Sequence, residues 1–208
     1  MPPTDRFVIS FAAEPPQDAA PYGRWADTLG ELFREACAQV ESEDGSDPGD
    51  PDEIAWFPDR TLGGRTYVPA TSHTANGHEY FGYVSYARAE DGETVDFRAV
   101  ADVTDETAAA NPDWQLDLSD EVVGTWRGEQ GRTAAMTLIW GVPIVGGGAI
   151  VTAELADLAV DQCELAQGGR FTLLAADAYR GDYLDIKLWS GRGELLATES
   201  LYVEDDDE

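Results

Sequence analysis

EYFGYVSYARAEDGETVDFRAVADVT, residues 79–104, predicts two β-strands joined by one tight turn. Aromatic and β-branched residues dominate both runs, and Glu90, Asp91 and Gly92 between them are typical turn residues. In the second run every other side chain is apolar, as expected for a strand with one buried face. These apolar positions are Val95, Phe97, Ala99, Ala101 and Val103. We therefore expect an antiparallel hairpin that packs one face on a core.

Short apolar segments separated by glycine-containing turns continue toward the C-terminus. The segment WQLDL places Trp114, Leu116 and Leu118 on one side of a strand. The later segments are EVVGTWRGE, residues 133–153, LAVDQCELA, RFTLLAADAY, YLDIKLWS and ELLATESLYV. About eight to nine short strands at this spacing predict a meander that closes into a barrel or folds into a sandwich.

The stretch TAAMTLIWGVPIVGGGAIVTA contains 21 residues without a charge, which is long enough for a membrane helix. Pro143 and the glycines at 146–148 interrupt it, and no cluster of basic residues flanks it. We therefore interpret residues 133–153 as two buried strands joined by the bend GVPIVGGG, and we expect no membrane binding.

The N-terminal part is predicted to hold one strand and one helix. RFVISF, residues 6–11, has the composition of a strand. Residues 21–41 repeat apolar side chains at spacings of three and four, which predicts an amphipathic helix that covers a sheet. Its apolar face contains Trp25, Leu29, Leu32, Phe33, Ala36 and Val40. The expected fold class is α+β, mostly antiparallel β, with this helix on the β-rich body.

The acidic stretch ESEDGSDPGDPDE separates these elements from the body. Pro48 and Pro51 break the register that a calcium-binding loop requires, so we interpret the stretch as a linker. The expected regions are an N-terminal unit at 1–41 packed on the body, the linker at 42–53, the β-rich body at 54–203 and an acidic tail at 204–208.

The charge balance excludes some partners and favours others. Asp and Glu number 41 against 13 Lys and Arg, and the net charge is -28. Such a surface repels nucleic acids and anionic lipids, but it is compatible with a basic protein partner. The composition is also typical of a halophilic or high-GC source. Cys37 and Cys163 do not make a disulfide framework and the N-terminus has no signal-peptide pattern, so we expect a cytoplasmic protein.

Residues 73–83, HTANGHEYFGY, contain both histidines of the chain. His73, His78 and Glu79 carry groups that bind divalent metals, but histidines five apart in a loop have no fixed geometry. We therefore expect neither a metal nor a cofactor. His78, Glu79 and Glu199 are the candidate catalytic residues, because imidazole and carboxylate groups serve as acids and bases.

Glu199 is a candidate because of the phase of the last strand. If Leu195 and Ala197 face the interior, Glu199 faces it too, and a buried carboxylate needs a partner or a ligand. The opposite phase places Leu196 and Tyr202 inside instead. The sequence leaves both phases open. Other candidates for ligand binding are Arg65, Tyr67, Trp126, Trp189 and Tyr202.

One stretch resembles a motif of the hotdog proteins. TANGHEYFGYVSYARAE, residues 74–90, is similar to their acyl-CoA thioesterase motif at Gly77 and His78 and in the Ala-Arg pair that follows, with Thr74 at the position of the motif's aspartate. The last predicted strands are similar to the last hotdog strands. This resemblance implies a central helix after His78 and an enzyme of hydrolase or lyase type.

A second stretch, VGTWRGE at residues 123–129, is similar to the Gly-x-Trp strand of calycin barrels. The resemblance implies that Trp126 closes the end of a barrel that binds a small molecule. The two matches together cover well under half of the chain, and we assign it to no family.

Two functions remain as hypotheses. The first is a non-catalytic, acidic interaction or assembly module that binds a protein partner, with a basic protein as one option, or a second copy of itself. The alternative is a small-molecule-binding barrel or hotdog-like enzyme with a site near His78 and Glu199. The sparse catalytic inventory favours the first.

Overall fold

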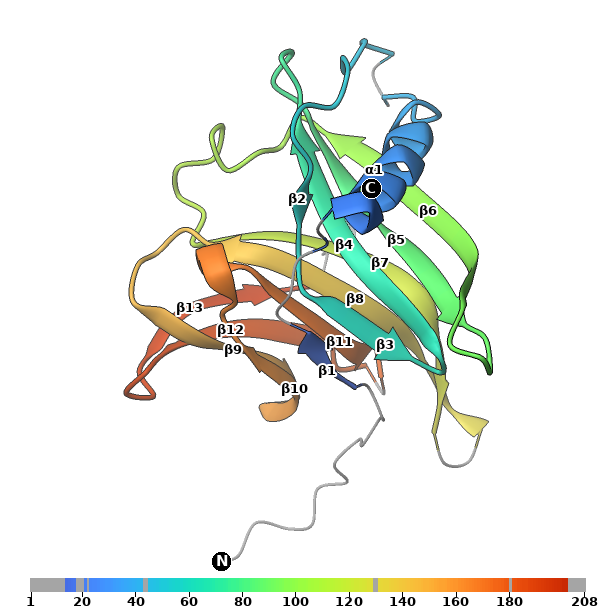
Figure 1. Cartoon of the computed structure of the whole chain (residues 1–208). Helices are drawn as coiled ribbons and strands as arrows, with labels where there is room; N and C mark the ends of the chain where they lie inside the picture. The colour runs from blue at the N-terminus through green and yellow to red at the C-terminus, as the bar shows by residue number, and fades with distance from the viewer. Residues whose placement is uncertain are drawn as a thin grey trace, which may run out of the picture.

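The structure is a computed structural model of the 208-residue chain (Figure 1). It describes residues 14–17, 21, 23–42, 45–128, 131–179 and 181–201. The strand predicted at residues 6–11, the acidic tail and Tyr202 lie outside these residues.

The described strands form three open sheets, which are antiparallel in every pairing. The six-stranded sheet contains β1 (Glu14–Gln17), β2 (Ala55–Trp56), β3 (Asp59–Leu62), β4 (Arg65–His73), β5 (Glu79–Arg88) and β6 (Thr94–Thr104). The three-stranded sheet contains β7 (Leu116–Arg127), β8 (Thr133–Pro143) and β11 (Phe171–Asp177). The four-stranded sheet contains β9 (Gly148–Leu155), β10 (Leu158–Glu164), β12 (Leu184–Ser190) and β13 (Leu195–Ser200).

Helix α1 (Gly23–Cys37) packs on the six-stranded sheet, as the sequence predicts (Figure 1). Leu29 and Phe33 are fully buried between the helix and the sheet. The ring of Trp25 lies edge-on to Tyr86, with 5.1 Å between the ring centroids. The predicted apolar face of the helix is therefore confirmed, and it forms its own core with β4, β5 and β6.

The predicted hairpin is confirmed as β5 and β6, which pair from Glu79 with Thr104 to Arg88 with Thr94. A β-bulge interrupts this register, and Asp96 takes a positive φ of 52°. Except for Val95, the apolar positions of β6 contact the core under α1. The same residues exclude the helix that the hotdog resemblance implies, because the chain after His78 is a strand.

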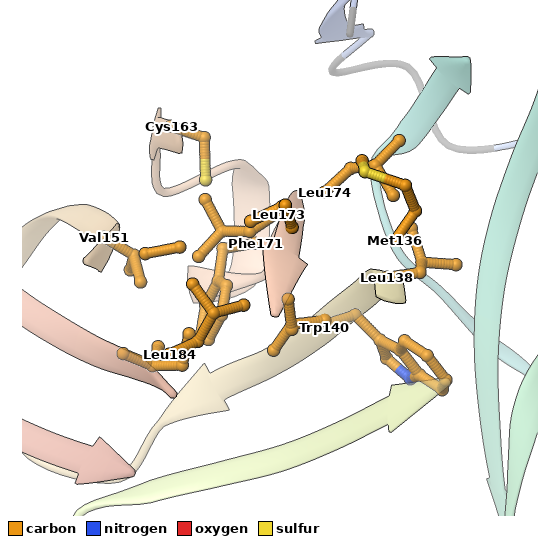
Figure 2. Close-up of a cluster of buried hydrophobic side chains, with 14 of the residues drawn as sticks. Met136, Leu138, Trp140, Val151, Cys163, Phe171, Leu173, Leu174 and Leu184 are labelled. Atoms are coloured by element: carbon orange, nitrogen blue, oxygen red, sulfur yellow. The ribbon is translucent and has the colours of Figure 1, made fainter. Parts of the chain in front are cut away.

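The main core lies between the three-stranded and four-stranded sheets (Figure 2). Leu173 on β11, Val151 on β9 and Leu184 on β12 are fully buried there. The six-stranded sheet adds Tyr67 and Tyr83 from the face that α1 does not cover. The two cores thus lie on opposite faces of the six-stranded sheet.

The predicted barrel is wrong, and the predicted meander is confined to β3, β4, β5 and β6 of the described strands. The described sheets are open, and the strand orders β11-β8-β7 and β10-β9-β12-β13 interleave segments that are distant in sequence. Strand β7 runs through most of both WQLDL and EVVGTWRGE, which the sequence predicts as two strands. The reason is that hydrophobic alternation marks each strand but does not say which other strand it pairs with.

The uncharged stretch at 133–153 forms strands, as predicted. These two strands, β8 and β9, belong to different sheets, and the bend between them carries the chain from one sheet to the other. In the part of the chain that the structure describes, no helix is both long and apolar enough to cross a membrane.

The two cysteines are buried in different cores and are not joined by a disulfide. Burial raises the pKa of the Cys37 thiol to about 11. This thiol is therefore protonated at neutral pH and is a poor nucleophile.

One carboxylate connects all three sheets. Oδ2 of Asp161, on β10, accepts hydrogen bonds from Nη2 of Arg60 on β3 at 2.6 Å and from the backbone N–H of Leu174 on β11 at 2.8 Å. The side chain of Arg60 is 2% exposed and that of Asp161 is 13% exposed. This ion pair, which is shielded from water, therefore bridges the three sheets.

Candidate functional site

The turn that contains both histidines divides them between two separate hollows. His73 ends β4 and Glu79 begins β5, and the two residues are direct partners across the strands. Nδ1 of His73 therefore lies 3.0 Å from Oε2 of Glu79. His78 lies in the turn beyond, where its Nε2 is 3.4 Å from Oγ of Ser46. Among the described residues there is no group of three metal ligands.

His73 and Glu79 line a pocket of about 180 Å³ between the six-stranded and three-stranded sheets. We call it the inter-sheet pocket. Its polar lining also includes Asp117 and Ser119 on β7, Trp140 on β8 and Arg170 before β11. These four residues come from segments distant from the histidine turn and are absent from the sequence-based candidates.

The two carboxyl groups of this pocket are poorly solvated. Burial raises the pKa of Glu79, and the nearby charge of Asp117 raises it further, whereas His73 lowers it. Burial also raises the pKa of Asp117, with His73 again opposing the shift. His73 is a weak counter-charge because its side chain is 71% exposed.

Trp140 and Arg170 supply the donors of the pocket; we call these two residues its donor wall, and Glu79 and Asp117 its acidic wall. The side chain of Trp140 is fully buried, and its Nε1 has no hydrogen-bond partner among the described residues. Arg170 donates from Nη1 to the backbone oxygen of Trp56 at 3.2 Å, and its guanidinium lies 5.7 Å from the ring centroid of Phe57. The arginine is therefore held in place at the pocket wall.

The raised pKa of Asp117 predicts a pH-dependent effect of Asp117→Asn. The folded chain binds this proton more tightly than the unfolded chain, so the carboxylate lowers the free energy of unfolding as pH rises above its ordinary pKa of 3.8. We expect Asp117→Asn to be more stable than the wild type at neutral pH. At a pH low enough to protonate Asp117 and Glu79, the two proteins should be equally stable. Denaturant titrations across this range measure the difference.

Asp157→Asn is the control, because the Asp157 side chain is 86% exposed. The difference in free energy of unfolding between Asp157→Asn and the wild type should not change over the same pH range. A neutral-pH loss of stability in Asp117→Asn would contradict the prediction.

The second hollow, of about 430 Å³, lies at the end of β6 and is lined by His78 and Phe81 together with carboxylates. We call it the acidic hollow. Its carboxylates are Glu41, Asp102, Asp105 and Glu106. Nδ1 of His78 is buried and has no hydrogen-bond partner within the described residues.

A third hollow, of about 580 Å³, runs between α1 and β6. We call it the helix-side hollow. Leu32 and Val40 form its apolar wall, Ala99 and Ala101 form its floor, and Glu35 lies at its side. Glu41 and Asp102 line both this hollow and the acidic hollow. The two hollows therefore meet along β6.

Strand β6 is an edge of the six-stranded sheet, since in the described chain it pairs with β5 alone (Figure 1). The carboxylate of Asp102 accepts a hydrogen bond from the backbone N–H of Val103 at 2.8 Å. The charge of Asp102 also raises the pKa of Glu121 on β7, after the larger effect of burial and that of Asp120. Negative charge is thus concentrated at this end of the edge.

Arg65 and Tyr67, predicted as ligand-binding residues, lie on β4 and make contacts within the protein. Nη1 of Arg65 donates to Oγ of Ser85 at 3.1 Å and to the backbone oxygen of Asp96 at 3.0 Å, and its Nη2 pairs with the Asp96 carboxylate. Tyr67 is buried edge-on to Tyr83, with 5.5 Å between ring centroids. Both residues connect strands.

The other candidates lie on the remaining two sheets. Trp126 on β7 stacks edge-on with Tyr179 at 5.3 Å, so it does not close a barrel. Nε1 of Trp189 donates to Oγ1 of Thr152 at 2.9 Å. Glu199 is exposed on β13 and lines none of these three hollows, so the structure does not bring it to His78.

No known family model, curated protein or solved structure matches this chain. Any function is therefore inferred from the residues and geometry of this chain itself.

Proposed function

We propose that this protein is a non-catalytic interaction module whose β6 edge binds an extended, basic segment of a partner protein. The observation that carries the proposal is an edge of 11 residues that pairs with β5 alone in the described chain, with two hollows beside it that share Glu41 and Asp102. An extended segment adds to such an edge through backbone hydrogen bonds, and its side chains give specificity.

The hollows suggest the chemistry of the segment. Successive side chains of an added strand point to opposite faces of the sheet. The helix-side hollow offers an apolar floor, which suits a small aliphatic side chain. The acidic hollow offers carboxylates and the ring of Phe81, which suit a Lys or Arg side chain. An alternation of basic and aliphatic residues fits both.

The charge of the protein favours a different protein as the partner. A second copy would bring another net charge of -28 to a carboxylate-rich edge, and such like-charge contacts are unfavourable. The bulge at Asp96 also protects the edge against indiscriminate strand pairing. A basic segment offsets the repulsion among these carboxylates.

The test uses a synthetic octapeptide that alternates Lys and Val. We expect it to protect backbone amides of residues 94–104 from hydrogen exchange and to bind less tightly as salt rises. The peptide that alternates Glu and Val is the sequence control and should not bind. Exchange measured by NMR locates the protected strand.

Two matched variants distinguish binding at the β6 edge from non-specific attraction of the peptide to the acidic surface. Asp102→Lys should weaken binding roughly tenfold, since it reverses a charge at the centre of the site. Glu199→Lys makes the same charge change on exposed β13 and should have little effect. Equal losses in both variants, or protection that falls on β13, would overturn the proposal. Self-association through β6 in sedimentation would identify a second copy as the partner and would overturn it too.

A further inference from the structure

The inter-sheet pocket contains a buried N–H donor without an acceptor in the described chain and two carboxyl groups with a weak counter-charge. On one wall, Trp140 is 0% exposed and its Nε1 donor has no acceptor among the described residues. A buried donor without an acceptor costs about 1–3 kcal/mol, so such atoms are rare and usually have a reason. Trp189 shows the usual solution, since its Nε1 donates to Thr152.

The indole of Trp140 is directed at the pocket. It extends from β8 away from Phe171 and Leu173 and toward the strands of the six-stranded sheet (Figure 2). The pocket lies between these sheets and Trp140 is part of its lining. The guanidinium of Arg170 lines the same pocket, so the donor wall has both an N–H group and a positive charge.

The counter-charge of the acidic wall is weak because it is exposed to water. The Glu79 and Asp117 carboxyl groups form this wall, and the group that lowers the pKa of both is the largely exposed ring of His73. Withdrawal of a carboxylate from water is costly unless a cation compensates it. An ammonium group between these carboxylates would supply that compensation.

The size of the pocket limits what can enter. A volume of about 180 Å³ is below the usual range for drug-sized ligands and holds on the order of ten heavy atoms. The ligand therefore has to present its two complementary charges within a few bonds of each other.

We propose that the inter-sheet pocket binds a small zwitterion of the amino-acid type. Its ammonium group lies between Glu79 and Asp117, and its carboxylate accepts from Nε1 of Trp140 and pairs with Arg170. This site is separate from the β6 edge, so its test does not depend on the proposed partner binding.

The test titrates glycine, β-alanine and γ-aminobutyrate into the ¹⁵N-labelled protein and observes the indole N–H resonance of Trp140 by NMR. The missing signal of Trp140→Phe assigns this resonance. We expect saturable shifts with at least one of the three zwitterions, because their lengths span the possible separations of the two walls. Methylamine and acetate, which each carry one charged group, should bind roughly tenfold more weakly.

Two variants test the two walls separately. Asp117→Asn should weaken the zwitterion roughly tenfold while it leaves acetate binding unchanged. Asp157→Asn, an exposed change, is its matched control and should bind as the wild type does. Trp140→Phe keeps an aromatic ring but removes the donor, and its binding is followed by calorimetry after circular dichroism confirms folding.

Several outcomes would overturn the proposal. No shift of the Trp140 resonance at up to about 10 mM, tenfold above a Kd of 1 mM, would exclude the zwitterion. Acetate or methylamine binding as tightly as the best zwitterion would identify a simple anion or cation site. An unchanged affinity of Asp117→Asn for the zwitterion would show that the acidic wall does not bind the ammonium group. This result would overturn the proposal even if Trp140→Phe does not fold.

Discussion

Gly82→Ala is expected to lower the free energy of unfolding by about 3 kcal/mol, at the upper end of the range for overpacked sites. A β-carbon at this position in β5 would lie 2.1 Å from the backbone oxygen of Val100 and 2.9 Å from Cα of Ala101. Both atoms belong to the backbone of β6, which can make room only by moving away from β5. The φ of 155° at Gly82 is also one that residues with a side chain rarely adopt.

Gly146→Ala is the matched control, because a β-carbon there would meet no atom within 4 Å and the backbone has no positive φ. Its stability should stay close to that of the wild type. Equilibrium denaturation in urea measures both variants. If Gly82→Ala is as stable as Gly146→Ala, then β6 does not lie as close to β5 as the structure has it.

Asp161→Ala has the second large expected effect, a loss of about 3–5 kcal/mol. The substitution leaves the Arg60 guanidinium buried without its counter-charge and removes the acceptor for the N–H of Leu174. Nε and Nη1 of Arg60 already lack hydrogen-bond partners in the described chain. No nearby group is therefore in place to compensate the charge.

The double variant Arg60→Leu with Asp161→Ala tests this reason for the loss. It removes the buried charge as well, so it should be more stable than Asp161→Ala alone. Asp157→Asn is the control for an exposed pair, since Asp157 is 3.6 Å from Lys187 but 86% exposed, and Asn tolerates its φ of 61°. Its effect should be about 0–1 kcal/mol. An Asp161→Ala loss no greater than this would show that the buried pair does not hold the sheets together.

Local patterns in the sequence predict α1 and the hairpin of β5 and β6, but they do not predict β1 to β4, which belong to the same six-stranded sheet. The face of α1 that contains Leu29 and Phe33 follows from helical periodicity, and the hairpin of β5 and β6 follows from alternation around one turn. These features depend on residues close together in the chain. The pairing of β11 with β8 does not, because it joins segments about 30 residues apart across two intervening strands.

The residues of the inter-sheet pocket also differ in how far the sequence predicts them. His73 and Glu79 come together because they flank one turn, and the sequence names both as candidate metal ligands without predicting that they would pair. Asp117 occupies a polar position in the alternating strand β7, which is an ordinary solvent-facing pattern. The face of β7 that carries Asp117 meets the six-stranded sheet because of how whole sheets pack, which the local pattern does not show. For the same reason Trp140 looks like any core residue of an apolar strand.

The passage of the chain from β8 to β9 has a consequence for synthesis on the ribosome. A nascent chain that has reached Thr104 already contains α1 and every described strand of the six-stranded sheet. Strand β8 ends at Pro143, but its partner β11 ends only at Asp177. At typical rates of translation, the apolar residues of β8 wait on the order of seconds for this partner. During that interval Leu138 and Ile139, fully buried in the finished protein, are available to a chaperone.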